Sequence, residues 1–158
     1  MKRLLIGVFG LALLSGFVTW VSAADNPAVG SWTINLAKSK YNPSALAPKS
    51  TTVKTDAVGD AFKAVIEVVD STGKALRYEY TYKLDGKDVP VTGDPNRDMT
   101  SVRRIDDHTY EQVNKRGAKV MTTSRVVYAK DGKSRTITTK GTNASGQTIN
   151  NVVVWDRQ

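Results

Sequence analysis

The chain alternates apolar and polar residues in ten short segments that follow a single N-terminal apolar segment. Turn residues, most of them Gly or Asp, separate these segments. Such short connections join antiparallel strands, because a parallel crossover needs many more residues. A meander of about ten strands leaves two long edges unless it closes on itself, so the pattern predicts an all-β fold: a single antiparallel up-and-down β-barrel of about 8–10 strands. The expected strands are residues 30–36, 51–58, 61–69, 75–84, 89–92, 99–105, 109–114, 119–129, 135–142 and 148–155.

One long connection interrupts this pattern, at residues 37–50. It contains Pro43 and Pro48, which argue against a strand because proline cannot donate a ladder hydrogen bond. If the connection folds over one mouth of the barrel, Tyr41 and Leu46 would form part of a lid. An ordinary surface loop is the alternative.

The expected fourth strand places Tyr78, Tyr80 and Tyr82 on one face, because side chains in a strand point alternately to opposite sides. Phenols mixed with Ser and Thr hydroxyls would give an amphipathic ligand both contact area and oriented hydrogen bonds. Alternatively, the rings simply fill a narrow barrel as packed core. The eighth strand is expected to point inward with Val120, Thr122, Ser124, Val126 and Tyr128.

Two arginines bear on ligand charge. Arg103 shares a strand face with Met99 and Ile105, and an inward orientation would let it pair with a ligand carboxylate through two hydrogen bonds. Arg125 falls opposite the face assigned to the interior and is expected outside. The candidate ligand-binding residues are Trp32, Tyr41, Leu46, Phe62, Ile66, Tyr78, Tyr80, Tyr82, Arg103 and Tyr128.

Residues 1–23 have the features of a secretory signal peptide. Lys2 and Arg3 precede an apolar stretch, and the short side chains at residues 21–23 predict cleavage after Ala23. A transmembrane anchor is the alternative, although three glycines weaken the apolar stretch as a permanent helix. The expected organisation is a signal peptide at 1–23 and a barrel domain at 24–158, located in the periplasm or secreted.

Positive charge is concentrated late in the chain, which has a net charge of +8. If the basic residues of this region form a positive face on the barrel, that face would attract an anionic envelope lipid or surface. Alternatively, the charges would simply keep the barrel soluble. Nucleic acid is not expected as a partner, because export removes it and no recognised binding motif accompanies the charges. The basic residues between positions 115 and 140 are Lys115, Arg116, Lys119, Arg125, Lys130, Lys133, Arg135 and Lys140.

The sequence gives little support for catalysis. His108 is the single histidine, it follows the Asp106-Asp107 turn, and it is expected to be solvated at a hairpin. The chain has no cysteine, and no His and carboxylate pattern suits a metal, so neither a metal nor another cofactor is expected. An enzyme that uses Tyr80 or Tyr82 as an acid remains a minor alternative.

Gly30-Ser31-Trp32 resembles the Gly-x-Trp that opens the barrel of lipocalins and fatty-acid-binding proteins, and residues 152–157 are similar to the closing strand of the latter group. In such barrels the opening Trp packs near the closing end under a basic side chain, a part that the resemblance gives to Arg157. Fatty-acid-binding proteins also carry an Arg-x-Tyr pair in the last strand. In that family the pair binds the ligand carboxylate. Val153 and Trp155 occupy those positions here, so this carboxylate-binding pair is absent.

Residues 36–43, 85–93 and 104–107 resemble exported bacterial lipocalin-like proteins of unassigned function. This likeness covers nearly all of the expected mature chain and implies a calycin-type barrel, while it implies a lipid ligand only loosely. The function favoured by these observations is the binding of a small hydrophobic or amphipathic molecule inside the barrel, without its transformation. The alternative outside the ligand-binding class is an envelope interaction protein that works through its basic outer face.

Overall fold

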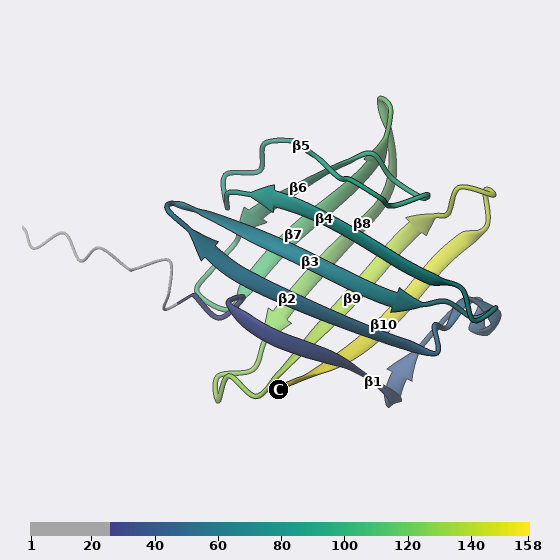
Figure 1. Cartoon of the computed structure of the whole chain (residues 1–158), viewed down its shortest axis with the longest axis horizontal. Helices are drawn as coiled ribbons and strands as arrows, with labels where there is room; N and C mark the ends of the chain where they lie inside the picture. Colours follow the sequence, from purple (N-terminus) through teal and green to yellow (C-terminus); the bar gives the residue numbers. More distant parts are fainter. Residues whose placement is uncertain (1–25) are drawn as a thin grey trace, which may run out of the picture.

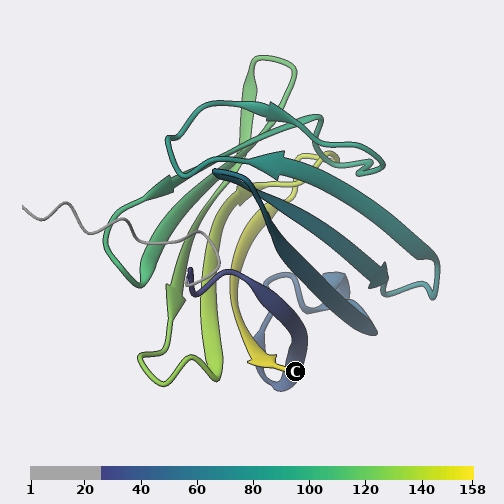
Figure 2. The same cartoon turned by 60° about the vertical axis from the view of Figure 1, so that its left-hand side comes forward.

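A computed structural model describes residues 26–158, which form ten β-strands and one short 3-10 helix. The ten strands lie in one antiparallel sheet that curls into a nearly closed barrel (Figures 1 and 2). The predicted fold class is confirmed. The strands are β1 (Gly30–Lys40), β2 (Ser50–Val58), β3 (Ala61–Val69), β4 (Ala75–Tyr82), β5 (Val89–Pro90), β6 (Met99–Arg104), β7 (Thr109–Arg116), β8 (Lys119–Tyr128), β9 (Ser134–Thr142) and β10 (Thr148–Arg157), with the helix η2 (Ser44–Leu46) between β1 and β2.

The strand order around the barrel is β4-β3-β2-β1-β10-β9-β8-β7-β6-β5. Apart from β4 and β5, each strand therefore pairs with its neighbours in sequence, and β1 pairs with β10 across the ends of the chain. The remaining seam lies between β4 and the short β5. There, Glu79 and Thr92 exchange two backbone hydrogen bonds of 3.0 Å each, and further along the seam Arg104 donates from its backbone to Leu84. This seam is the sparsest part of the wall, because β5 spans only two residues.

The connection after β1 is shorter than expected. Strand β1 continues to Lys40, so the prediction that residues 37–40 form a loop is wrong. A bulge between Asn35 and Lys40 accommodates the extra residues, so that pairing to β10 is interrupted after Asn35 and resumes at Lys40. The hydroxyl of Ser39 helps to fill the interrupted ladder: it donates to the carbonyl of Asn35 at 2.6 Å and accepts the backbone N–H of Val154 at 3.0 Å. The connection that remains contains η2 and lies at the barrel mouth.

A second bulge alters the inward face of β8. The register slips where Lys115 pairs with Val120, so that Met121 becomes an additional residue in the strand. Met121 is buried, whereas Val120 is half exposed, and the expected inward orientation of Val120 is wrong. Thr122, Ser124, Val126 and Tyr128 do face inward, as their alternation predicts.

One end of the barrel is closed by packed aromatic rings. Trp32 is fully buried and forms an edge contact with Tyr128, and the Trp32 Nε1 donates to the carbonyl of Ala28 at 3.2 Å. Arg157 lies over the Trp32 ring at 4.8 Å and donates to two backbone carbonyls of the segment that precedes β1. The expected packing of Arg157 on the opening tryptophan is confirmed.

The predicted signal peptide at residues 1–23 lies outside the described residues. In the part of the chain that the structure describes, no helix is long and apolar enough to span a membrane.

Candidate functional site

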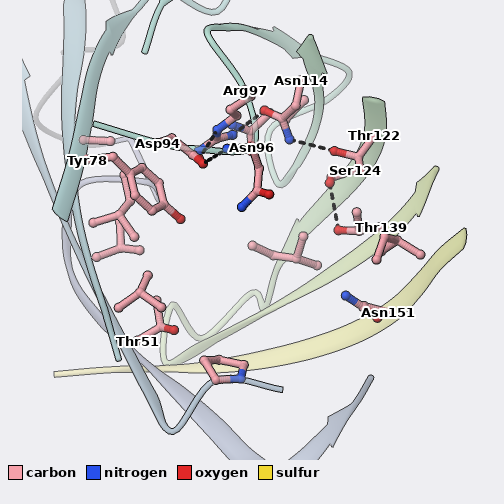
Figure 3. A pocket seen from close by; sticks show the side chains of 18 of the residues that line it. Thr51, Tyr78, Asp94, Asn96, Arg97, Asn114, Thr122, Ser124, Thr139 and Asn151 are labelled. Atoms are coloured by element: carbon pink, nitrogen blue, oxygen red, sulfur yellow. Dashed lines mark hydrogen bonds and ion pairs between the residues drawn. The ribbon is translucent and has the colours of Figure 1, made fainter. Parts of the chain in front are cut away.

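A cavity of about 620 Å³ occupies the barrel interior between the packed end and the mouth. Side chains from β2, β3 and β4 form one wall, and side chains from β7, β8, β9 and β10 form the opposite wall (Figure 3). Because strand side chains alternate, the residues of these strands that line the cavity lie mostly at every second position. The barrel is therefore hollow over part of its length and packed at one end.

The two walls differ in chemistry. The β2–β4 wall is largely apolar and carries Val53, Ala64, Ile66, Val68 and Leu76 together with the phenols of β4. The opposite wall presents amide and hydroxyl groups, several of which already bond one another. The Ser124 and Thr139 hydroxyls lie 2.8 Å apart, and the Asn114 amide donates to Thr122 Oγ1 at 3.0 Å. A ligand in this cavity would meet an apolar surface on one flank and hydrogen-bonding groups on the other.

The mouth is partly covered by the segment that follows β1. Tyr41, Leu46 and Pro48 of this segment line the cavity, as a lid would require. Burial raises the pKa of the Tyr41 phenol to about 12, so the group is neutral at physiological pH. Tyr41 and Leu46 therefore meet the cavity, as the sequence predicted.

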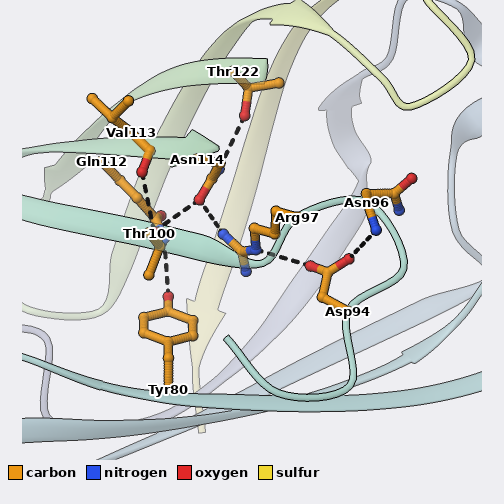
Figure 4. Close-up of polar contacts among 9 residues, drawn as sticks. All are labelled: Tyr80, Asp94, Asn96, Arg97, Thr100, Gln112, Val113, Asn114 and Thr122. Atoms are coloured by element: carbon orange, nitrogen blue, oxygen red, sulfur yellow. Dashed lines mark hydrogen bonds and ion pairs between the residues drawn. The ribbon is translucent and has the colours of Figure 1, made fainter. Parts of the chain in front are cut away.

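A buried ion pair lies on the wall beside the β4–β5 seam. Arg97 Nε donates to Asp94 Oδ2 at 2.8 Å, and the two side chains are 11% and 8% exposed. The guanidinium also bonds Asn114 Oδ1 and lies 5.2 Å from the ring centroids of both Tyr78 and Tyr80 (Figure 4). This cluster ties the loop before β6 to the cavity surface.

Gly93 permits the close approach of that loop to β4. Its φ is +89°, and a Cβ atom at this position would lie 2.4 Å from the backbone oxygen of Arg77. Only glycine fits such a contact without movement of the backbone. The loop that begins here carries Asp94 and Arg97 to the cavity.

The three tyrosines of β4 all line the cavity. Burial raises the pKa of Tyr78 and Tyr82 above the usual range of a phenol. Tyr80 Oη accepts a hydrogen bond from Gln112 Nε2 at 3.1 Å, and that amide also donates to Thr100 Oγ1 at 3.0 Å. The expected inward orientation of this stripe is confirmed, and the two phenols with raised pKa present O–H donors to the cavity.

Arg135 is the second guanidinium that reaches the cavity, and it lies at the packed end. The residue is 7% exposed and its guanidinium carbon lies 4.8 Å from the Trp32 ring and 5.0 Å from the Trp155 ring. Its Nη1 donates to Tyr128 Oη at 3.2 Å, while its Nε is buried without a partner among the described residues. The expectation that Arg135 belongs to a positive outer face is wrong.

Most of the predicted ligand-binding residues are brought together. Ile66, Tyr78, Tyr80, Tyr82 and Tyr128 surround the cavity along with the two mouth residues. Phe62 and Trp32 instead belong to the packed aromatic end.

The inward orientation proposed for Arg103 is wrong. Its side chain is 58% exposed and bonds Glu111 Oε1 at 2.8 Å on the outer surface. Thr100 and Val102 are the residues of β6 that face inward. Met99 begins the strand, Ile105 follows its last residue, and neither lines the cavity. Arg125 is exposed, as expected.

Sequence reasoning missed Asp94, Arg97, Gln112, Asn114 and Arg135. For Arg135 a signal was present: Ile137 is the large apolar residue of β9, and Arg135 and Thr139 share its parity. Gln112 and Asn114 lie two and four positions after the buried Tyr110, so alternation along β7 indicates that they face inward as well. Asp94 and Arg97 come from a loop, where alternation gives no information.

The remaining basic residues near the end of the chain lie outside. Lys115 pairs with Asp88 at 2.6 Å, and six others are exposed: Arg116, Lys119, Arg125, Lys130, Lys133 and Lys140. His108 lies at the β6–β7 hairpin but is half-buried, and its Nδ1 has no partner among residues 26–158. Within this same range, no group of three or more His, Cys, Asp or Glu side chains is placed to hold a metal ion.

The buried phenols predict a dependence of stability on alkaline pH. Tyr41 and Tyr110 have pKa values of about 12 in the folded protein, because burial disfavours the phenolate, against about 10 when unfolded. Above pH 10 the unfolded chain binds fewer protons, so the free energy of unfolding falls between about pH 10 and 12. Tyr110 alone accounts for up to about 3 kcal/mol of that loss.

Denaturant unfolding at several pH values, with absorbance at 295 nm to count phenolates, measures this effect. Folded protein at pH 10.5 should hold fewer phenolates than protein in guanidinium chloride at the same pH. Equal phenolate counts in both, with the fold intact by circular dichroism, would contradict the burial of these rings.

Comparison of the chain with protein-family models and with curated protein sequences finds no match. The architecture, ten antiparallel strands in a nearly closed barrel, is compatible with a calycin-like fold.

Proposed function

We propose that the protein binds one small amphipathic molecule inside its barrel and does not transform it. The observation that carries this proposal is the cavity of about 620 Å³, with an apolar wall on β2–β4 and a polar wall on β7–β10. Sites for small molecules are usually concave spaces of about 300–1,000 Å³ in which a few polar groups orient an apolar body. The volume and the chemistry of this cavity both fit that description.

The position of the cavity supports the same function. Its packed end is sealed by rings around Trp32, and its mouth is bordered by Tyr41, Leu46 and Pro48. A ligand would enter through the mouth and lie along the barrel axis, largely removed from water. The apolar part of the ligand would contribute about 25 cal/mol for each Å² that it buries.

We further propose that the barrel is related to lipocalins and fatty-acid-binding proteins. The packing of Arg157 on Trp32 supports this relationship, because it reproduces the contact that the Gly-x-Trp resemblance implies. The predicted signal peptide supports a periplasmic or secreted location, where a carrier would meet molecules of the cell envelope or the medium.

Filling the cavity should abolish binding of an apolar probe. Val68 lines the cavity from β3 and is only partly buried, so Val68→Trp adds an indole to the space without disturbing the packed end. We expect the Kd of N-phenyl-1-naphthylamine, which fluoresces when it leaves water, to rise at least about tenfold, or about 1.4 kcal/mol. Fluorescence titration of the purified protein measures the change.

Val127→Trp is the matched control, because Val127 is 40% exposed on the outer surface of β8. It makes the same chemical change outside the cavity and should leave the Kd unchanged. If the wild-type protein does not bind the probe, or if both variants bind it as the wild type does, the proposed function fails.

A further inference from the structure

We propose that the packed end of the cavity is an anion site, and that the ligand is an amphipathic organic acid whose anionic group binds Arg135. The inference rests on the proposed function, since it specifies which end of the ligand enters first. It adds a chemical class, an organic anion rather than a neutral amphiphile. It also adds an orientation, with the acidic group deep and the apolar body toward the mouth.

The charge of Arg135 is not compensated by the protein. Arg135 is 7% exposed, and no carboxylate of residues 26–158 lies within 4.0 Å of its guanidinium nitrogens. An isolated buried charge is costly, and proteins usually pair it. Arg135 lines the cavity, so a partner for this cation can arrive from that side, while the rings of Trp32, Trp155 and Tyr128 lie around the guanidinium.

The aromatic neighbours hold the guanidinium without using up its donors. Ring faces stabilise a cation through their quadrupoles, but they leave the N–H groups in the guanidinium plane available for hydrogen bonds. In the described part of the chain the Arg135 side chain makes one hydrogen bond, from Nη1 to Tyr128 Oη. A planar fork of this kind suits a carboxylate or another oxygen anion.

The phenols beside Arg135 suit the same ligand group. Tyr82 and Tyr128 are 7% and 4% exposed, and both line the cavity at this end. Burial raises the pKa of Tyr82, so that this phenol stays protonated and can donate a hydrogen bond to a ligand. One guanidinium and the phenol hydroxyls form a set of hydrogen-bond donors, which binds an anionic oxygen better than a cation or an ether.

Arg97 makes a useful contrast inside the same cavity. Its guanidinium is already paired with Asp94 at 2.8 Å and also bonds Asn114 (Figure 4). The buried charges around the cavity are therefore two guanidinium groups and one carboxylate, which leaves one positive charge in excess. That excess charge is on Arg135, at the end opposite the mouth.

Two fluorescent probes that differ only by an anionic group test this assignment. 8-Anilinonaphthalene-1-sulfonate carries a sulfonate, and N-phenyl-1-naphthylamine has the same rings without it. For Arg135→Met we expect the affinity for the sulfonate probe to fall at least about tenfold, while the affinity for the neutral probe changes less than about twofold. Arg135→Lys keeps the positive charge but loses the planar pair of N–H donors. This variant should retain part of the preference for the sulfonate probe over the neutral probe.

Arg125→Met is the matched control, since Arg125 is exposed on the outside of β8 and its replacement removes the same charge from the protein. It should leave both affinities unchanged. The assignment of the anion site is wrong if Arg135→Met lowers neither affinity, lowers both equally, or behaves as Arg125→Met does. Binding of the neutral probe would in that case still support the proposed function. Absence of binding by either probe to the wild type would overturn both.

A measurement on the wild-type protein covers the case in which Arg135→Met fails to fold. A crystal structure with 8-anilinonaphthalene-1-sulfonate should place the sulfonate within hydrogen-bond distance of the Arg135 guanidinium, with the rings toward β3 and β4. A sulfonate located on Arg97, at the mouth or on the outer surface would overturn the assignment.

Discussion

Replacing Gly141 by alanine should lower the free energy of unfolding by at least about 3 kcal/mol, or prevent folding. Gly141 has a φ of +144°, which L side chains rarely adopt, and it faces the bulge of β8. A Cβ atom there would lie 2.1 Å from the backbone oxygen of Met121 and 2.7 Å from the Cα of Thr122. Both obstacles are backbone atoms, so a change of rotamer cannot relieve the contact.

Gly132→Ala separates this clash from ordinary glycine strain. Gly132 also has a positive φ, +69°, but a Cβ atom there would meet nothing within 4 Å. We expect it to cost about 1 kcal/mol in urea unfolding, from backbone strain alone. Similar losses in the two variants would show that the close packing of β8 against β9 at the bulge is wrong.

Truncation of Trp32 to alanine should cost about 3–5 kcal/mol, as expected for a large ring removed from a packed core. Trp32 is fully buried and lies between two guanidinium groups, Arg135 inside and Arg157 at the barrel end, each 4.8 Å away. Its loss leaves a void at the closed end and takes away the ring on which both cations lie. Equilibrium unfolding in urea measures the change.

Trp32→Phe keeps a ring in this position and loses only part of the volume and the hydrogen bond to Ala28. Trp32→Phe should lower the free energy of unfolding clearly less than Trp32→Ala does. A Trp32→Ala variant within about 1 kcal/mol of the wild type would mean that this end of the barrel is not the packed closure described above.

The number and order of the strands could be predicted from the alternation of apolar and polar residues, because side chains in a strand have a period of two and the turns are rich in Gly and Asp. The inward stripe of Tyr78, Tyr80 and Tyr82 follows from that period. Prediction failed where the period changes. At β8 the bulge places Met121 inside and Val120 outside, and in β1 a second bulge extends the strand to Lys40. A bulge depends on pairing with another strand, so one segment read alone does not reveal it.

The candidate site was less predictable than the fold for a different reason. Hydropathy predicts that arginine lies on the surface and therefore predicts an outer Arg135, although Arg135 and the large apolar residue Ile137 lie two positions apart and so on the same face of β9. The alternation that Arg103 shares with Met99 and Ile105 predicts an inward side chain, but Met99 begins β6, Ile105 lies just beyond it, and neither lines the cavity. Asp94 and Arg97 reach the cavity only because Gly93 lets their loop approach β4. That contact joins segments which are distant in the sequence.

Native mass spectrometry of the protein purified from the cells that naturally produce it tests the central claim most directly. A hollow barrel that carries an amphipathic acid should appear with a one-to-one adduct of small mass, which is lost on denaturation and is missing from Val68→Trp. An apo mass under conditions that preserve the fold, in the wild type as in Val68→Trp, would contradict the account.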